Sequence, residues 1–120
     1  MDDKNPIVDF SYVMELGGGR KDFVHQVLSI FMENTAPGLK ELEQLVRNTD
    51  DWDAISKQAH FLKSSVGIVK VRGMQEHLHE IEILGKGKKD KAAIVRLLDE
   101  IVETFAEAEG VILEQMEAAS

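Results

Sequence analysis

Apolar side chains recur every three or four residues in several long segments, and this periodicity limits the fold more than any other feature of the sequence. Because an α-helix turns by about 100° per residue, such spacing gathers apolar side chains on one face. No segment alternates apolar and polar residues for long enough to predict a strand. We therefore expect an all-α protein. The clearest stripe consists of Trp52, Ile55, Ala59, Leu62, Val66 and Val69.

Glycine, proline and potential capping residues divide this pattern into helices. The triple glycine Gly17–Gly19 is expected to end a short first helix, because the backbone freedom of glycine makes a helix costly. Pro37 fits the first turn of a helix, so we expect a break before it and a new helix to about Asn48. Asp50 or Asp51 can cap the helix that follows. The expected helices cover approximately residues 10–16, 21–36, 37–48, 51–69, 74–85 and 94–116, and the last is expected to be the longest.

The connections between these helices are short, which favours antiparallel neighbours. The predicted architecture is an up-and-down antiparallel four-helix bundle with one or two extra N-terminal helices covering one end or side. We expect residues 1–120 to form a single domain, since a chain of this length can bury enough apolar surface to fold without metals or disulfides. The sequence has no cysteine, which excludes disulfides, cysteine nucleophiles and cysteine-based metal sites.

Charge and hydropathy exclude further classes of function. The formal net charge of -8 disfavours binding to nucleic acid or to anionic membrane surfaces. The N-terminus is acidic and polar where a signal peptide would be basic and then apolar, and no run of about 18 apolar residues occurs. We therefore expect a cytoplasmic protein with no membrane contact.

One surface strip of the helix expected over residues 51–69 carries reactive and small side chains together. On a helical wheel His60 points about 135° away from the apolar stripe, Ser64 lies nearly opposite the stripe, and Lys63 and Gly67 share the flank of His60. A neutral imidazole has an unshared pair that can attack phosphorus, and a nearby lysine can compensate the anionic product. Glycine inside a helix costs about 1 kcal/mol relative to alanine, which close approach by another molecule would explain. The strip predicts a phosphoacceptor histidine.

The segment Ala59–Ser65, with the sequence AHFLKSS, resembles the signature of the histidine-containing phosphotransfer (HPt) domains. The resemblance extends to residues 14–19, Phe23, residues 31–42 and residues 78–82, and so spans most of the chain. Two positions differ, because the family usually has glycine where this chain has Ser64 and commonly a second glycine where it has Lys70.

The resemblance implies a phosphorelay intermediate. Such a protein accepts a phosphoryl group on His60 from the Mg-dependent phosphoaspartate of one response-regulator receiver domain and passes it to another. A hybrid histidine kinase is a further potential partner, while autokinase and nucleotide-hydrolysing activity are not expected. The resemblance also places a polar residue at Glu82, on the following helix, where it can accept a hydrogen bond from Nδ1–H of the histidine and leave Nε2 as the nucleophile.

Two apolar residues leave alternatives open. Phe61 and Ile68 are seven residues apart and both point away from the apolar stripe of their helix. They either pack against the N-terminal helices or form a docking patch for a receiver domain beside the reactive histidine.

Other signals have ordinary structural explanations. His77 and His79 are two residues apart, so on a helix they point to nearly opposite sides and do not predict a metal site. The glycine-rich turns lack the spacing of a nucleotide-binding loop, and no cofactor is expected. Two alternative functions remain: a non-enzymatic helical adaptor in which His60 is incidental, and the phosphoacceptor dimerisation part of a histidine kinase. The second should dimerise, whereas this pattern predicts a monomer.

Overall fold

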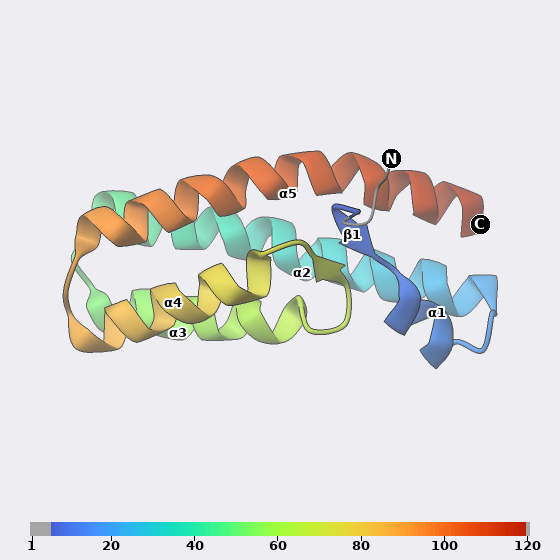
Figure 1. Cartoon of the computed structure of the whole chain (residues 1–120), viewed down its shortest axis with the longest axis horizontal. Coiled ribbons are helices and arrows are strands. Elements are labelled where there is room, and N and C mark those ends of the chain that lie inside the picture. The colour runs from blue at the N-terminus through green and yellow to red at the C-terminus, as the bar shows by residue number, and fades with distance from the viewer. Residues whose placement is uncertain (1–5, 120) are drawn as a thin grey trace.

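The computed structural model describes residues 6–119 of the chain. These residues form a helical bundle in which α2 and α5 run the length of the molecule, α3 and α4 lie along one half of it, and α1 and β1 lie toward the other end (Figure 1). The prediction of an all-α four-helix bundle is confirmed, with α1 as its extra N-terminal helix, and α5 is the longest helix, with 29 residues. The elements are β1 (Val8–Asp9), α1 (Ser11–Leu16), α2 (Lys21–Asn48), α3 (Trp52–Ser65), β2 (Lys70–Val71), α4 (Met74–Gly87) and α5 (Lys91–Ala119).

The predicted break before Pro37 is wrong, because α2 is one helix of 28 residues with Pro37 inside it. Proline removes one backbone hydrogen bond and crowds the preceding turn, at a cost of about 3 kcal/mol. The apolar stripe continues across the proline, with Phe31, Leu39 and Leu42 all buried. Packing of this stripe against α3 and α5 keeps the helix continuous.

The helix predicted to reach about Val69 ends earlier, at Ser65. A turn follows, and β2 then pairs antiparallel with β1, with Val8 opposite Val71. The expectation of no strand is therefore wrong for β1 and β2. With two residues each, they are too short to show the alternation of apolar and polar residues that predicts a strand. The helix end was predicted too late because Val69, in the turn, continues the apolar spacing and is buried in the same core as the helix.

Local backbone chemistry sets the start of the two helices that carry the site. The Asp51 side chain accepts a hydrogen bond of 3.1 Å from the backbone N–H of Ala54 and so caps α3. Gly73 precedes α4 with a φ of +72°, a conformation that favours glycine. The two helices lie side by side, and α4 packs on α3 more extensively than on any other element.

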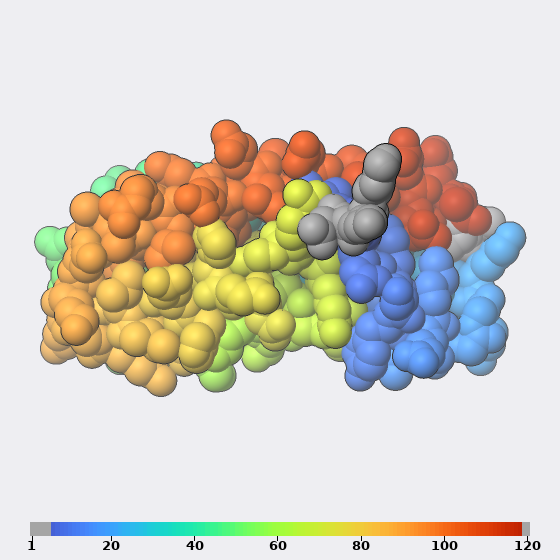
Figure 2. Space-filling view, viewed as in Figure 1, coloured from blue at the N-terminus to red at the C-terminus, as the bar shows by residue number. Residues whose placement is uncertain are grey.

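A continuous apolar core fills the space between the long helices. Buried side chains from each of the four bundle helices contribute to it, and Val8, Val13 and Val71 extend it beneath α1 and the two strands. Figure 2 shows α4 and the first half of α5 over one half of the visible face, with α1 over the other half. Within residues 6–119 no helix has the length and apolar character needed to cross a membrane.

Candidate functional site

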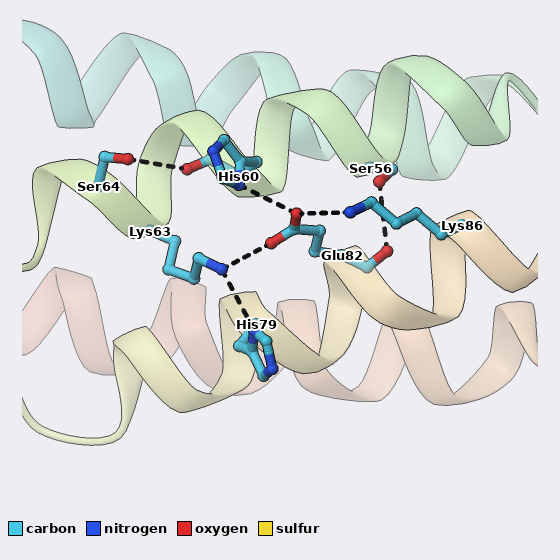
Figure 3. Close-up of polar contacts among 7 residues, drawn as sticks. All are labelled: Ser56, His60, Lys63, Ser64, His79, Glu82 and Lys86. Atoms are coloured by element: carbon cyan, nitrogen blue, oxygen red, sulfur yellow. Dashed lines mark hydrogen bonds and ion pairs between the residues drawn. The ribbon is translucent and has the colours of Figure 1, made fainter.

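His60 and Glu82 face each other from the adjacent helices α3 and α4 (Figure 3). The His60 Nδ1 atom lies 3.0 Å from Glu82 Oε2, so the contact expected from the sequence is present. The His60 side chain is 62% exposed, whereas that of Glu82 is only 7% exposed. An ionised carboxylate has no hydrogen to donate, so Nδ1 donates to it. In the neutral imidazole the unshared pair then lies on Nε2, the nitrogen that makes no contact with Glu82.

Two lysines bind the same carboxylate. Lys63 Nζ lies 2.8 Å from Glu82 Oε1, and Lys86 Nζ lies 3.3 Å from Oε2. The ion pair with Lys63 is the main reason why the pKa of Glu82 falls from 4.5 to about 2, and Lys86 and His60 contribute in the same direction. Together they outweigh the burial of the carboxylate, which acts to raise its pKa. Glu82 is therefore a permanent anion at neutral pH.

A second histidine extends this network. Lys63 Nζ is 3.2 Å from His79 Nδ1 as well as in contact with Glu82 (Figure 3). An ammonium group only donates, so His79 Nδ1 accepts and the proton of its neutral ring is on Nε2. The sequence alone predicts neither His79 nor Lys86 as a residue of the site. Their spacings of three and four residues from Glu82 on one helix are the signal that would have grouped them.

The two small residues of the predicted strip occupy different settings. Ser64 is exposed on α3, and its Oγ donates to the backbone carbonyl of His60 at 3.4 Å. Gly67 lies in the turn after α3 rather than inside a helix, so the argument from its helix propensity is wrong. A Cβ atom on Gly67 would lie 3.3 Å from the carbonyl oxygen of Ser64, which shows that the turn folds back closely on the helix end.

Phe61 and Ile68 contact α2 and yet stay exposed. Their exposed fractions are 49% and 42%. A Cβ on Gly38 of α2 would lie 3.5 Å from the ring of Phe61, so the ring lies beside that helix. Ile68 borders a shallow hollow of about 260 Å³ between α2 and the end of α3. Phe61 and Ile68 therefore lie against α2, whereas their role in docking a receiver domain stays a prediction. The hollow is lined by Val27, Ile30, Phe31, Asn34, Ser65, Ile68 and Val69.

The two remaining histidines, His25 and His77, contact residues outside the His60–Glu82 site. His77 Nε2 is 2.6 Å from Glu100 Oε1 on α5, and His25 Nδ1 is 3.1 Å from the carbonyl oxygen of Met116. Among the described residues no group of three or more histidine, aspartate or glutamate side chains is placed to hold a metal ion. Of the four histidines, all of them within residues 6–119, only His60 combines a contact to a buried carboxylate with a largely exposed ring.

The lowered pKa of Glu82 predicts how stability depends on pH. The carboxylate protonates near pH 4.5 when unfolded and near pH 2 when folded, so its stabilising contribution is complete above pH 4.5 and is lost as the pH falls toward 2. We expect the ionised Glu82 carboxylate to contribute roughly 1–2 kcal/mol to the free energy of unfolding. This is less than the full pKa shift implies, because solvent screens the charge of Lys86. Urea unfolding of the wild type and of Glu82→Gln should show their difference vanishing over this range.

The exposed carboxylate of Glu80, on the same helix, provides the control for this measurement. A Glu80→Gln variant should follow the wild type across the whole pH range. An equally steep loss of stability in Glu82→Gln and in the wild type would show that Glu82 does not carry the effect.

The sequence matches the family model described as Hpt domain over residues 26–119. The fold is similar to an X-ray structure from rice assigned to a histidine-containing phosphotransfer protein, with a TM-score of 0.79 and 16% sequence identity. That similarity covers 94% of this chain and 81% of the rice chain. No curated protein was found to match the sequence. At this identity the structural similarity establishes the fold, whereas the family match covers well over half of the chain.

Proposed function

Because this chain belongs to the Hpt domain family, we propose that it carries a phosphoryl group on His60 between receiver domains of a phosphorelay. The observation that supports this most directly is the pairing of an exposed imidazole with a buried carboxylate. Glu82 holds the Nδ1–H and fixes the tautomer whose Nε2 is free to attack.

The proposed phosphoryl transfer requires only the two proteins and the receiver's own Mg²⁺. Nε2 of His60 attacks the phosphorus of a receiver aspartyl phosphate; the N–P bond forms, the P–O bond breaks, and the aspartate leaves as a carboxylate. The product ring keeps the proton on Nδ1 and is therefore positively charged, which the anion of Glu82 stabilises. Transfer to a second receiver is the reverse of this step.

Lys63 is the proposed electrostatic partner of the transferred group. It lies one turn after His60, and its side chain is 23% exposed. Its ammonium group is held near His60 by the ion pair with Glu82. A phosphoryl group on the neighbouring imidazole adds negative charge, which the ammonium compensates.

The function is tested by incubating the purified chain with a receiver domain carrying radiolabelled phosphoaspartate. We expect label to appear on the chain in an acid-labile, base-stable form, as phosphohistidine requires. A helical adaptor would accept none. The dimerisation part of a histidine kinase would instead sediment as a dimer and require a kinase domain with ATP.

We propose that Phe61 and Ile68 form the docking patch for the receiver domain, with Ser64 and Gly67 leaving room beside His60. Large exposed apolar side chains next to a reactive group are typical of an interface centre. Phe61→Ser should weaken receiver binding about tenfold, the effect of roughly 1.4 kcal/mol of lost contact. Titration calorimetry with the unphosphorylated receiver measures it.

Leu113 provides the matched control for this experiment. It is 51% exposed and belongs to the last turns of α5. The C-terminal end of α5 lies away from α3 (Figure 1). Leu113→Ser should bind the receiver as the wild type does. Equal losses in the two variants, or unchanged affinity of Phe61→Ser, would exclude the patch as the docking site.

A further inference from the structure

Helices α3 and α4 approach each other closely where Ser56 faces Gly85, one turn away from the His60–Glu82 contact. A Cβ atom on Gly85 would lie 3.2 Å from Ser56 Cβ and 3.3 Å from both Cα and N of Ser56. Two of these three atoms belong to the α3 backbone and are unable to rotate aside. Both residues are buried. A side chain at position 85 would therefore push the two helices apart.

The same contact includes a hydrogen bond to the residue that holds His60. Ser56 Oγ donates to the backbone carbonyl oxygen of Glu82 at 3.2 Å, and both residues are only 5% exposed (Figure 3). Ser56 lies four residues before His60 on α3, and Gly85 lies three residues after Glu82 on α4. The helices thus touch backbone to backbone directly beside the reactive pair.

The backbone of Gly85 gives no other reason for glycine. Among the described residues, the glycines with positive φ are Gly18, Gly19 and Gly73, and Gly85 is not one of them. It lies inside α4, where glycine is a poorer helix former than alanine. The close approach to α3 is what the missing side chain permits.

We propose that Gly85 and Ser56 are positioning residues, which set the separation of α3 and α4 so that the Glu82 carboxylate reaches Nδ1 of His60. The inference rests on the proposed phosphotransfer function and explains how the fold orients the His60 ring with its Nε2 unprotonated. A carboxylate–imidazole hydrogen bond of 3.0 Å weakens when its donor and acceptor move apart. A shift of a few tenths of an ångström between the helices acts directly on that distance.

The first test compares Gly85→Ala with Gly87→Ala. Both replace a glycine of α4 by a better helix former, but a Cβ on Gly87 would meet only the flexible side chain of Lys89, at 3.4 Å. We expect ¹⁵N NMR of the His60 ring to show that Gly85→Ala loses the Nδ1–H tautomer and approaches the spectrum of Glu82→Ala. Gly87→Ala should keep the wild-type spectrum.

The second test measures whether Gly85 acts through Glu82. Gly85→Ala should slow phosphotransfer about threefold in the wild type, since small misplacements of a reacting group reduce rates strongly. In a Glu82→Ala background it should have no further effect. Equal slowing in both backgrounds would show a merely structural role. A folded Gly85→Ala protein with wild-type tautomer and rate would also overturn the proposal.

Ser56→Ala keeps the proposal testable if Gly85→Ala does not fold. It retains the Cβ that packs on Gly85 and removes only the hydrogen bond to Glu82, and it should move the His60 spectrum in the same direction. Wild-type tautomer populations in this variant would then decide against the proposal. The NMR measurement needs no phosphate and therefore tests the positioning role independently of the phosphotransfer function. If the chain accepts no label from any receiver, the proposed function is refuted. The tautomer populations of His60 would still show whether Gly85 and Ser56 position the ring.

Discussion

The His60→Gln variant should fold normally and accept no phosphoryl label from a phosphorylated receiver. The His60 side chain is 62% exposed and adds little to the core, so the free energy of unfolding should change by no more than about 0.5 kcal/mol. The glutamine amide can still donate to Glu82, which also keeps Lys63 and Lys86 as partners. It has no imidazole nitrogen to attack phosphorus, so transfer should be undetectable.

Two other histidines serve as controls for this result. His25→Gln and His77→Gln should both accept label at the wild-type rate, because their rings contact Met116 and Glu100 rather than the cluster around Glu82. Label in His60→Gln, or phosphate mapped by mass spectrometry to another histidine, would remove His60 as the acceptor.

Glu82→Ala should slow transfer by about tenfold without abolishing it. The variant removes the hydrogen bond of 3.0 Å to His60 together with the anion that Lys63 and Lys86 bind, and a loss of roughly 1.4 kcal/mol of orientation and charge compensation at His60 corresponds to that factor. The nucleophile itself remains. Single-turnover transfer from a phosphorylated receiver measures the rate constant directly.

Glu82→Gln separates orientation from charge in the same assay. Its amide oxygen can still accept from Nδ1–H and hold the ring, but it carries no negative charge to stabilise the phosphorylated, positively charged imidazole. We expect a rate between those of the wild type and Glu82→Ala. A wild-type rate in Glu82→Ala would contradict the positioning role, and complete loss would assign Glu82 a part in the chemical step itself.

The exposure of His60 and the class of fold were predictable because both follow from local periodicity. The direction of a side chain from a helix is set by its position relative to the apolar stripe, and the Ile55–Leu62 stripe is long enough to define it. The contact between His60 and Glu82 was also predictable, since the family resemblance indicates Glu82 as the polar residue that accepts from the histidine.

What the sequence did not show depends on the tertiary packing. The continuity of α2 through Pro37 is decided by burial of its apolar face, which outweighs local propensity. The convergence of Lys63, Lys86 and His79 on one carboxylate depends on how closely α3 and α4 approach. That separation is fixed at Ser56 and Gly85, two residues that carry no chemical signal in the sequence.

The short β1–β2 pairing couples two parts of the chain that local unfolding would otherwise open separately. It joins Val8 to Val71, and the Arg72 N–H donates to the carbonyl oxygen of Ile7 at 2.8 Å. The turn that it secures carries Ile68, a residue of the proposed docking patch. Detachment of residues 7–9 would remove this pairing and leave the turn held by its buried valines, so we expect the two segments to lose protection together in hydrogen exchange. The order of the proposed docking patch is thus expected to depend in part on a strand that has no part in the chemistry.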